Sequence, residues 1–134
     1  AKEVGFDVML IDPRSHFGTS ERFPGVEVSN DWPDEFLKKL KLSDKDCLVT
    51  LTHDPKIDDP ALQIALACPL FSICCLGSKR THEARKNRLL NSGITERQFD
   101  RIHGPAGLDI NAKTPAEIAV SILAELIKDW RGRA

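Results

Sequence analysis

The chain has 134 residues, of which 41% are apolar and 29% are charged, the composition of an ordinary soluble protein. Its 19 basic and 20 acidic side chains give a formal net charge of −1, which argues against a general nucleic-acid-binding surface. No apolar run approaches the roughly 20 residues of a membrane span, and the N-terminus lacks the layout of a secretory signal. We therefore expect a cytoplasmic protein whose residues 1–134 form a single domain.

Short strand-like runs alternate with helical patterns in the first half of the chain. The expected elements are strands at 6–11, 26–28 and 47–52 and a helix at 33–40. The next helix is expected to begin at Asp59, with the Asp59 side chain as its cap and Pro60 at its first position.

The same alternation continues in the second half. The apolar run at 71–76 is typical of a strand buried on both faces. A basic helix is expected to follow Gly77-Ser78-Lys79-Arg80 and to run to about Asn91, with Ser78 as its cap and Gly93 at its close. A short helical turn at 95–99 and a weak strand at 101–103 complete this part.

The last helix has the clearest start signal. Thr114 can cap it, Pro115 suits its first position, and Glu117 can close a capping box. The apolar stripe of this helix is expected at Ile118, Ile122, Leu126 and Trp130, widened by Ala119, Leu123 and Ile127.

This order of elements predicts an α/β fold, a mainly parallel sheet with flanking helices. Residues 1–5 look like the tail of a helix, so the first strand and its glycine turn are expected upstream of Ala1. We therefore expect a fragment of a longer protein, in which the sheet is left as two halves with unpaired edges.

Four polar clusters follow the expected strands: Asp12-Pro13-Arg14, Thr52-His53-Asp54, Gly77-Ser78-Lys79-Arg80, and the loop from Gly107 to Glu117. Loops that follow parallel strands gather at the carboxyl edge of the sheet, where ligands bind. The last cluster also combines a glycine-rich loop with a helix N-terminus, an arrangement that favours anions.

His53 raises two further hypotheses. With Asp54, Asp58 and Asp59 it could hold a hard or borderline cation, or it could act as a general acid or base. The acids lie on a turn and Asp59 has a capping role, so we predict no metal site. The sequence places no serine or cysteine beside His53, so we predict no catalytic residue.

The remaining reactive side chains receive structural interpretations. Lys86 and Arg88 are interpreted as a solvated helix face, and Arg80 is the better ligand candidate. Cys74 and Cys75 are neighbours on a strand and point to opposite faces, so core packing is expected for both. All four cysteines are expected to be free thiols.

These clusters, in this order, resemble the C-terminal domain of the XdhC/CoxI family of accessory factors. The matching segments are Asp12-Pro13-Arg14, Glu21-Arg22-Phe23-Pro24, Thr52-His53-Asp54, Leu76-Gly77-Ser78-Lys79-Arg80 and the stretch 104–119. The family commonly has glycine where Asn111 stands, a mild change because asparagine tolerates the left-handed conformation.

The resemblance implies a Rossmann-like, non-catalytic factor that binds molybdenum cofactor. Such factors deliver the cofactor to an apo molybdenum hydroxylase such as xanthine dehydrogenase; a cysteine desulfurase and a second copy of the chain are further expected partners. The implied cofactor-binding residues are Asp12, Arg14, Thr52, His53, Gly77, Ser78, Arg80, Gly107, Leu108, Asp109 and Thr114.

Two alternatives stay open. The first is an oxidoreductase domain that binds NAD(P) and uses Asp12 for the ribose, although no convincing set for hydride or proton transfer accompanies it. The second is an interaction domain with a vestigial pocket.

Overall fold

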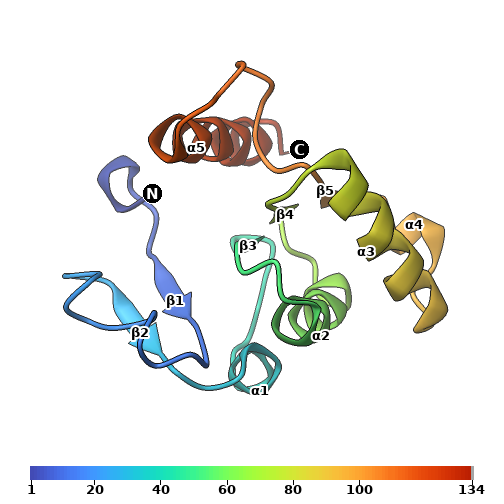
Figure 1. Ribbon diagram of the computed structural model, residues 1–134, viewed down its shortest axis with the longest axis horizontal. Helices are drawn as coiled ribbons and strands as arrows, with labels where there is room; N and C mark the ends of the chain where they lie inside the picture. Colours follow the sequence, from blue (N-terminus) through green and yellow to red (C-terminus); the bar gives the residue numbers. More distant parts are fainter. Residues whose placement is uncertain (134) are drawn as a thin grey trace. The chain divides into compact units, whose positions relative to one another are not determined.

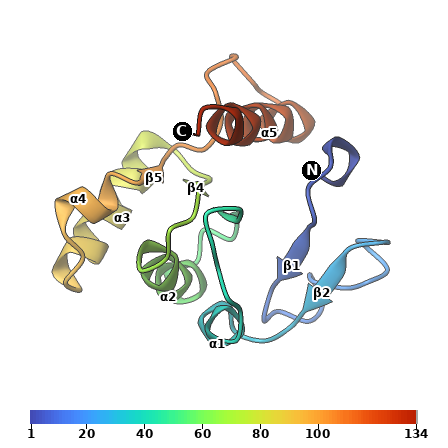
Figure 2. The same cartoon turned by 180° about the vertical axis from the view of Figure 1, so that it is seen from behind.

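A computed structural model of the protein describes residues 1–133. The chain divides into two compact units, residues 1–41 and residues 42–134. Figures 1 and 2 give the two views of the ribbon in which the elements of each unit can be followed.

The N-terminal unit is built around two short parallel strands. It consists of the 3-10 helix Lys2–Val4, strands β1 (Met9–Ile11) and β2 (Glu27–Ser29), and helix α1 (Pro33–Lys38). Leu10 pairs with Val28 at the middle of the ladder. After the strands, the Asn30 side-chain amide donates to the backbone oxygens of Asp12 and Gly18, which holds the loop that follows β1.

The C-terminal unit contains the larger sheet. Its elements are β3 (Cys47–Thr50), α2 (Pro55–Leu66), β4 (Ser72–Cys75), α3 (Lys79–Asn91), α4 (Glu96–Phe99), β5 (Ile102–His103) and α5 (Pro115–Arg131). The sheet order is β3-β4-β5 and both pairings are parallel. The predicted Rossmann-like α/β class is confirmed.

The two faces of this sheet differ in chemistry. Ile73 and Cys75 of β4 belong to an apolar core, with α2, α3 and α4 supplying residues such as Leu62, Leu89 and Phe99. Ser72 and Cys74 alternate with them and interact with acidic residues of α5. Helix α5 therefore covers one face of the sheet, and α2 and α3 lie on the other, as both views show (Figures 1 and 2).

The predicted start of α2 is wrong. The helix begins at Pro55, four residues before Asp59, and the Asp54 carboxylate caps it by accepting from the Lys56 N–H at 3.0 Å. Pro60 lies inside the helix. Asp-Pro occurs twice in this stretch, and the first pair, which follows the strand directly, provides the cap.

Asp59 instead pairs with Arg88 of α3. The Arg88 Nε donates to Asp59 Oδ2 at 2.8 Å and a second guanidinium nitrogen donates to Oδ1 at 3.3 Å. The interpretation of Arg88 as part of a solvated face is therefore wrong, because its charged end connects α3 to α2.

The other predicted helix starts are confirmed. Ser78 caps α3, and Thr95 and Thr114 close complete capping boxes at α4 and α5. The buried face of α5, however, is Ser121, Ile122, Glu125 and Leu126. The predicted stripe was wrong at Ala119 and Ile127, which are exposed; two buried polar residues take part in the face instead.

Within residues 1–133, no helix combines the length and apolar character needed to cross a membrane.

Candidate functional site

The loops that follow β3, β4 and β5 leave the same edge of the C-terminal sheet. Hydrogen bonds extend the ladder beyond the strands, from the Leu76 N–H to the Thr50 oxygen at 3.0 Å and from the Ala106 N–H to the Cys75 oxygen at 2.9 Å. Three of the four predicted polar clusters therefore start side by side. The fourth, Asp12-Pro13-Arg14, belongs to the N-terminal unit.

The loop after β3 is ordered by a buried acid. Thr52 Oγ1 donates to Asp58 Oδ1 at 2.7 Å and accepts from the Asp54 N–H at 3.1 Å. Burial raises the pKa of the Asp58 carboxyl, although the hydrogen bond from Thr52 opposes this shift. Thr52 thus fixes the loop, and His53, at a positive φ of 62°, is exposed beside it.

The three carboxylates that were grouped with His53 have different partners. Asp54 caps α2, Asp58 accepts from Thr52, and Asp59 pairs with Arg88. Because each carboxylate bonds a different partner, the three are not directed at one point beside His53.

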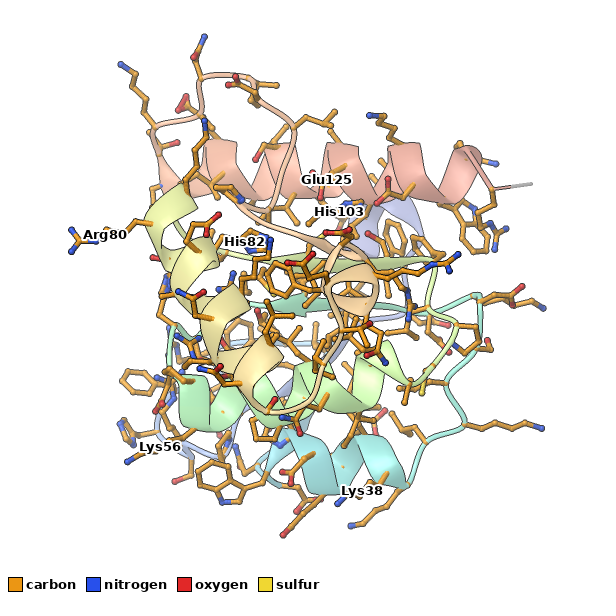
Figure 3. The ribbon with its side chains drawn as sticks, turned by 90° about the vertical axis from the view of Figure 1, so that its right-hand side faces the viewer. Lys38, Lys56, Arg80, His82, His103 and Glu125 are labelled. Atoms are coloured by element: carbon orange, nitrogen blue, oxygen red, sulfur yellow. The ribbon has the colours of Figure 1, made fainter. Side chains whose placement is uncertain are left out.

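The loop after β4 presents a helix N-terminus with basic neighbours. Gly77 has φ +144°, and Ser78 Oγ accepts from the Thr81 N–H at 3.1 Å. The first turn of α3 contains no acidic residue, whereas Lys79 and Arg80 are exposed there. Figure 3 shows Arg80 extending away from the ribbon. Of the three loops, this one therefore has the charges most favourable to an anion.

A buried arginine supports the same edge and was missed in the sequence. Arg85 is 3% exposed and donates to the Leu76 oxygen at 3.2 Å, and its guanidinium lies 3.1 Å from His82 Nδ1. Burial and the Arg85 charge lower the pKa of His82. A side chain at Gly104 would collide with the His82 ring. Two features of the sequence indicate this arrangement. His82 and Arg85 are three positions apart and so share a helix face, and Gly104 leaves room for the His82 ring.

The glycine-rich loop after β5 is attached to α5 at Gly107. This residue has φ +102°, a Cβ on it would collide with Ser121, and the next N–H, of Leu108, bonds the Ser121 oxygen at 3.1 Å. Asn111 has φ 57°, so the prediction that it tolerates the left-handed conformation is confirmed. Asp109 and Thr114 are exposed.

In the N-terminal unit, Asp12 and Arg14 form a two-pronged ion pair. The Arg14 Nε and Nη2 donate to the two Asp12 carboxylate oxygens at 3.0 Å each, and the Arg14 N–H adds a bond of 2.9 Å. Burial opposes ionisation of Asp12, but these hydrogen bonds outweigh it and lower the pKa of the carboxyl. Asp12 is therefore a buried, ionised group at the end of β1.

A second polar cluster was not anticipated. Cys74, His103, Glu125 and Asp129 bring their side-chain ligand atoms together beneath α5. The expectation of plain core packing holds for Cys75 but not for Cys74, whose thiol donates to Glu125 Oε1 at 3.0 Å. The feature of the sequence that indicates this cluster is the pair Glu125 and Asp129, two acids four residues apart on α5.

Comparison with known proteins places this geometry in a family. Residues 1–126 match the family model described as the XdhC Rossmann domain. A solved structure of a xanthine dehydrogenase from Bacillus halodurans superposes with a TM-score of 0.83 at 35% identity, over 100% of this chain and 38% of that one.

Curated relatives agree. A Bacillus subtilis protein, named as a probable xanthine dehydrogenase subunit, is 32% identical over 96% of this chain and 37% of its own length. "Molybdenum cofactor insertion chaperone PaoD" of Escherichia coli is 33% identical over 59% of this chain and 25% of its own length. The chain thus spans well under half of these relatives. The match over residues 1–126 and the shared fold show that it belongs to the XdhC family.

Proposed function

We propose that this chain is the Rossmann-like domain of an accessory factor that binds molybdenum cofactor and passes it to an apo molybdenum hydroxylase such as xanthine dehydrogenase. The observation that carries the proposal is the convergence of three strand-end loops on one sheet edge, with an acid-free, basic helix N-terminus among them. The names of two relatives, one a cofactor insertion chaperone, support the same role.

The chemistry of this edge of the C-terminal sheet suits molybdenum cofactor. Molybdenum cofactor is a pterin that carries a phosphate, so it needs a site for an anion. The first N–H groups of α3 point out of its end; that of Thr81 bonds the Ser78 hydroxyl, and the others have no partner within the helix. Lys79 and Arg80 add positive charge at the same end. Together they provide a place for the phosphate, with Arg80 as a donor suited to two of its oxygens.

The proposed binding residues fall into two roles. His53, Ser78, Arg80, Asp109 and Thr114 are exposed and are the proposed contacts. Thr52, Gly77, Gly107 and Leu108 shape the loops, since Thr52 bonds Asp58 and Gly107 lies against Ser121. The loop residues act by positioning the contacts. Asp12 and Arg14 lie in the N-terminal unit, where they pair with each other.

A second candidate function rests on Asp12. A carboxylate that ends a strand and stays ionised could bind the ribose of NAD(P). Both of its oxygens already accept from Arg14, however, which leaves fewer lone pairs for a ribose. We therefore rank this function below the first.

The test measures whether the protein retains molybdenum cofactor or NAD(H). The purified full chain is incubated without oxygen with molybdenum cofactor or with NAD(H), desalted, and assayed for molybdenum by mass spectrometry and for nucleotide by absorbance. We expect molybdenum to be retained. In Ser78→Asp, a negative charge at the α3 N-terminus should lower retention by about tenfold or more, because it repels the phosphate.

Thr95→Asp is the matched control, because it introduces the same charge at another exposed helix cap, that of α4, which does not follow a strand end. It should retain the cofactor like the parent protein. Retention of nucleotide alone would favour the oxidoreductase. If Ser78→Asp and Thr95→Asp retain equal molybdenum, the proposed phosphate position is wrong. A protein that retains neither compound contradicts both functions.

A further inference from the structure

A separate cluster of potential metal ligands lies between α5 and the sheet. It consists of Cys74 from β4, His103 from β5, and Glu125 and Asp129 from α5, and we call it the α5 cluster. Figure 3 shows His103 and Glu125 pointing toward one another where the sheet meets α5. The cluster lies on the sheet face opposite the apolar core and takes no part in the strand-end loops.

The distances in the α5 cluster are close to those of a four-coordinate ion. All four ligand atoms lie within 4.8 Å of one another. Glu125 Oε1 is 3.0 Å from Cys74 Sγ and 3.1 Å from His103 Nδ1, and Asp129 Oδ2 is 3.4 Å from the same nitrogen. Bonds of about 2.0–2.3 Å in a tetrahedral zinc site put neighbouring ligand atoms roughly 3.3–3.8 Å apart. The three distances given for Glu125 and His103 are within a few tenths of an ångström of that range, and the remaining pairs, which lie within 4.8 Å, would have to close by up to about 1 Å.

Regular secondary structure holds these side chains in place. Cys74 and His103 are directly paired residues on neighbouring strands. Glu125 and Asp129 are four residues apart and share the buried side of α5. Ser72 supports the cluster from the next position on the same strand face, because its hydroxyl donates to Asp129 Oδ2 at 2.6 Å. Such outer hydrogen bonds orient metal ligands in known sites.

The charges of the α5 cluster also favour a cation. Glu125 is 8% exposed and the Asp129 side chain 18% exposed, so two carboxylates lie close together with little solvent. A divalent ion would balance both carboxylates and stabilise the Cys74 thiolate.

A route to the cluster is present. A cavity of about 560 Å³ in the C-terminal unit is lined by His103, Asp129 and residues near the end of α5. The His103 side chain is 41% exposed. An ion can therefore reach the ligands from solvent without opening the sheet.

We propose that Cys74, His103, Glu125 and Asp129 bind one divalent ion of the zinc type, which fastens α5 to the sheet. The mixture of thiolate, imidazole and carboxylate selects a borderline metal over magnesium or calcium, which prefer all-oxygen sites. Four protein ligands complete a tetrahedron, as in sites where zinc has a structural role. This metal site is separate from the strand-end loops at which we propose that molybdenum cofactor binds.

The test uses cobalt as a spectroscopic probe and zinc as a competitor. The purified full chain is stripped with a chelator, then titrated with Co²⁺ and afterwards with Zn²⁺. We expect one Co²⁺ per chain, the visible bands of a four-coordinate ion, a sulfur-to-cobalt charge-transfer band, and displacement by Zn²⁺. Saturating Zn²⁺ should raise the Tm, because an ion bound only by the folded state stabilises it.

Variants separate the α5 cluster from other thiols and imidazoles. Cys74→Ser keeps a hydroxyl that can bond Glu125, and it should abolish the charge-transfer band and weaken zinc binding by about tenfold or more. Asp129→Asn, which preserves side-chain shape, should also weaken binding and remove most of the zinc-dependent rise in Tm. Cys68→Ser and His16→Gln are the controls and should bind Co²⁺ and Zn²⁺ like the parent protein, because neither residue belongs to the α5 cluster.

The proposal is overturned if the parent protein binds no zinc at micromolar free concentration, or if its Tm does not respond to zinc. It is equally overturned if the charge-transfer band survives in Cys74→Ser or disappears in Cys68→Ser. In those cases the α5 cluster is a hydrogen-bonded network. Circular dichroism of each variant identifies any that fails to fold, and the remaining variant of the pair then decides.

Discussion

Gly107 and Gly93 have nearly the same φ angle but different surroundings. Their φ angles are +102° and +101°. A Cβ at Gly93 would meet nothing within 4 Å, whereas one at Gly107 would collide with Ser121. The pair therefore separates the cost of a left-handed alanine from the cost of a steric clash.

We expect Gly93→Ala to lower the free energy of unfolding by about 1–2 kcal/mol, the cost of left-handed backbone alone. Gly107→Ala should cost roughly 1–3 kcal/mol more, because Ser121 or the glycine loop must also shift. Urea denaturation of both variants measures the difference. Equal losses would mean that the loop moves freely and that Gly107 does not fix it to α5.

Single residues also explain why part of the site was predictable. Glycine, proline and short polar residues act locally, so Ser78, Thr114 and Asn111 could be interpreted from their immediate neighbours, and the structure confirms those roles as two caps and a left-handed residue. Arg85 could not, because its burial depends on Leu76 and His82 being brought together by the fold.

At the scale of elements, the helix starts were easier to predict than the helix faces. A cap needs only a few adjacent residues, whereas the buried side of α5 depends on what β4 presents to it. Ser72 and Cys74 offer polar atoms, so Glu125 and Asp129 turn toward them while Ile127 remains 39% exposed. Apolar periodicity has no means of detecting a buried polar face.

The same limit explains the error at α2 and leads to a prediction. Asp59 could cap a helix by its sequence, but the ion pair with Arg88, 29 positions away, becomes visible only in three dimensions. A double-mutant cycle with Asp59→Asn and Arg88→Met should give a coupling energy of about 1 kcal/mol, because the pair is two-pronged but the arginine is partly exposed.

Urea denaturation of the four proteins of this cycle provides the measurement. The coupling should shrink when the salt concentration rises from about 0.05 to about 0.5 M, since ions screen partly exposed charges. Asp54→Ala is the comparison, because it removes the real cap of α2 and should cost about 1 kcal/mol without depending on Arg88. If the losses of unfolding free energy in the two single variants simply add, the ion pair contributes no coupling energy between α2 and α3.

At the scale of the whole molecule, the two units differ in how much structure they bury. Every residue of β4 is buried, and β4 is paired on both sides. In the N-terminal unit, β1 and β2 contain no fully buried residue and pair only with each other among the described residues. A two-stranded sheet is marginally stable by itself, whereas local stability rises with burial and pairing.

We therefore expect the amides of β4 to exchange with solvent at a rate set by global unfolding, and those of β1 and β2 to exchange by local opening, at least about tenfold faster after correction for intrinsic rates. Hydrogen exchange followed by NMR at two pH values measures both. Because denaturant acts on exposed surface, low urea should accelerate exchange in β4 more steeply than in β1. Equal protection and equal urea dependence in the two sheets would mean that both units unfold in one step. The two structural units would then not be separate units of stability.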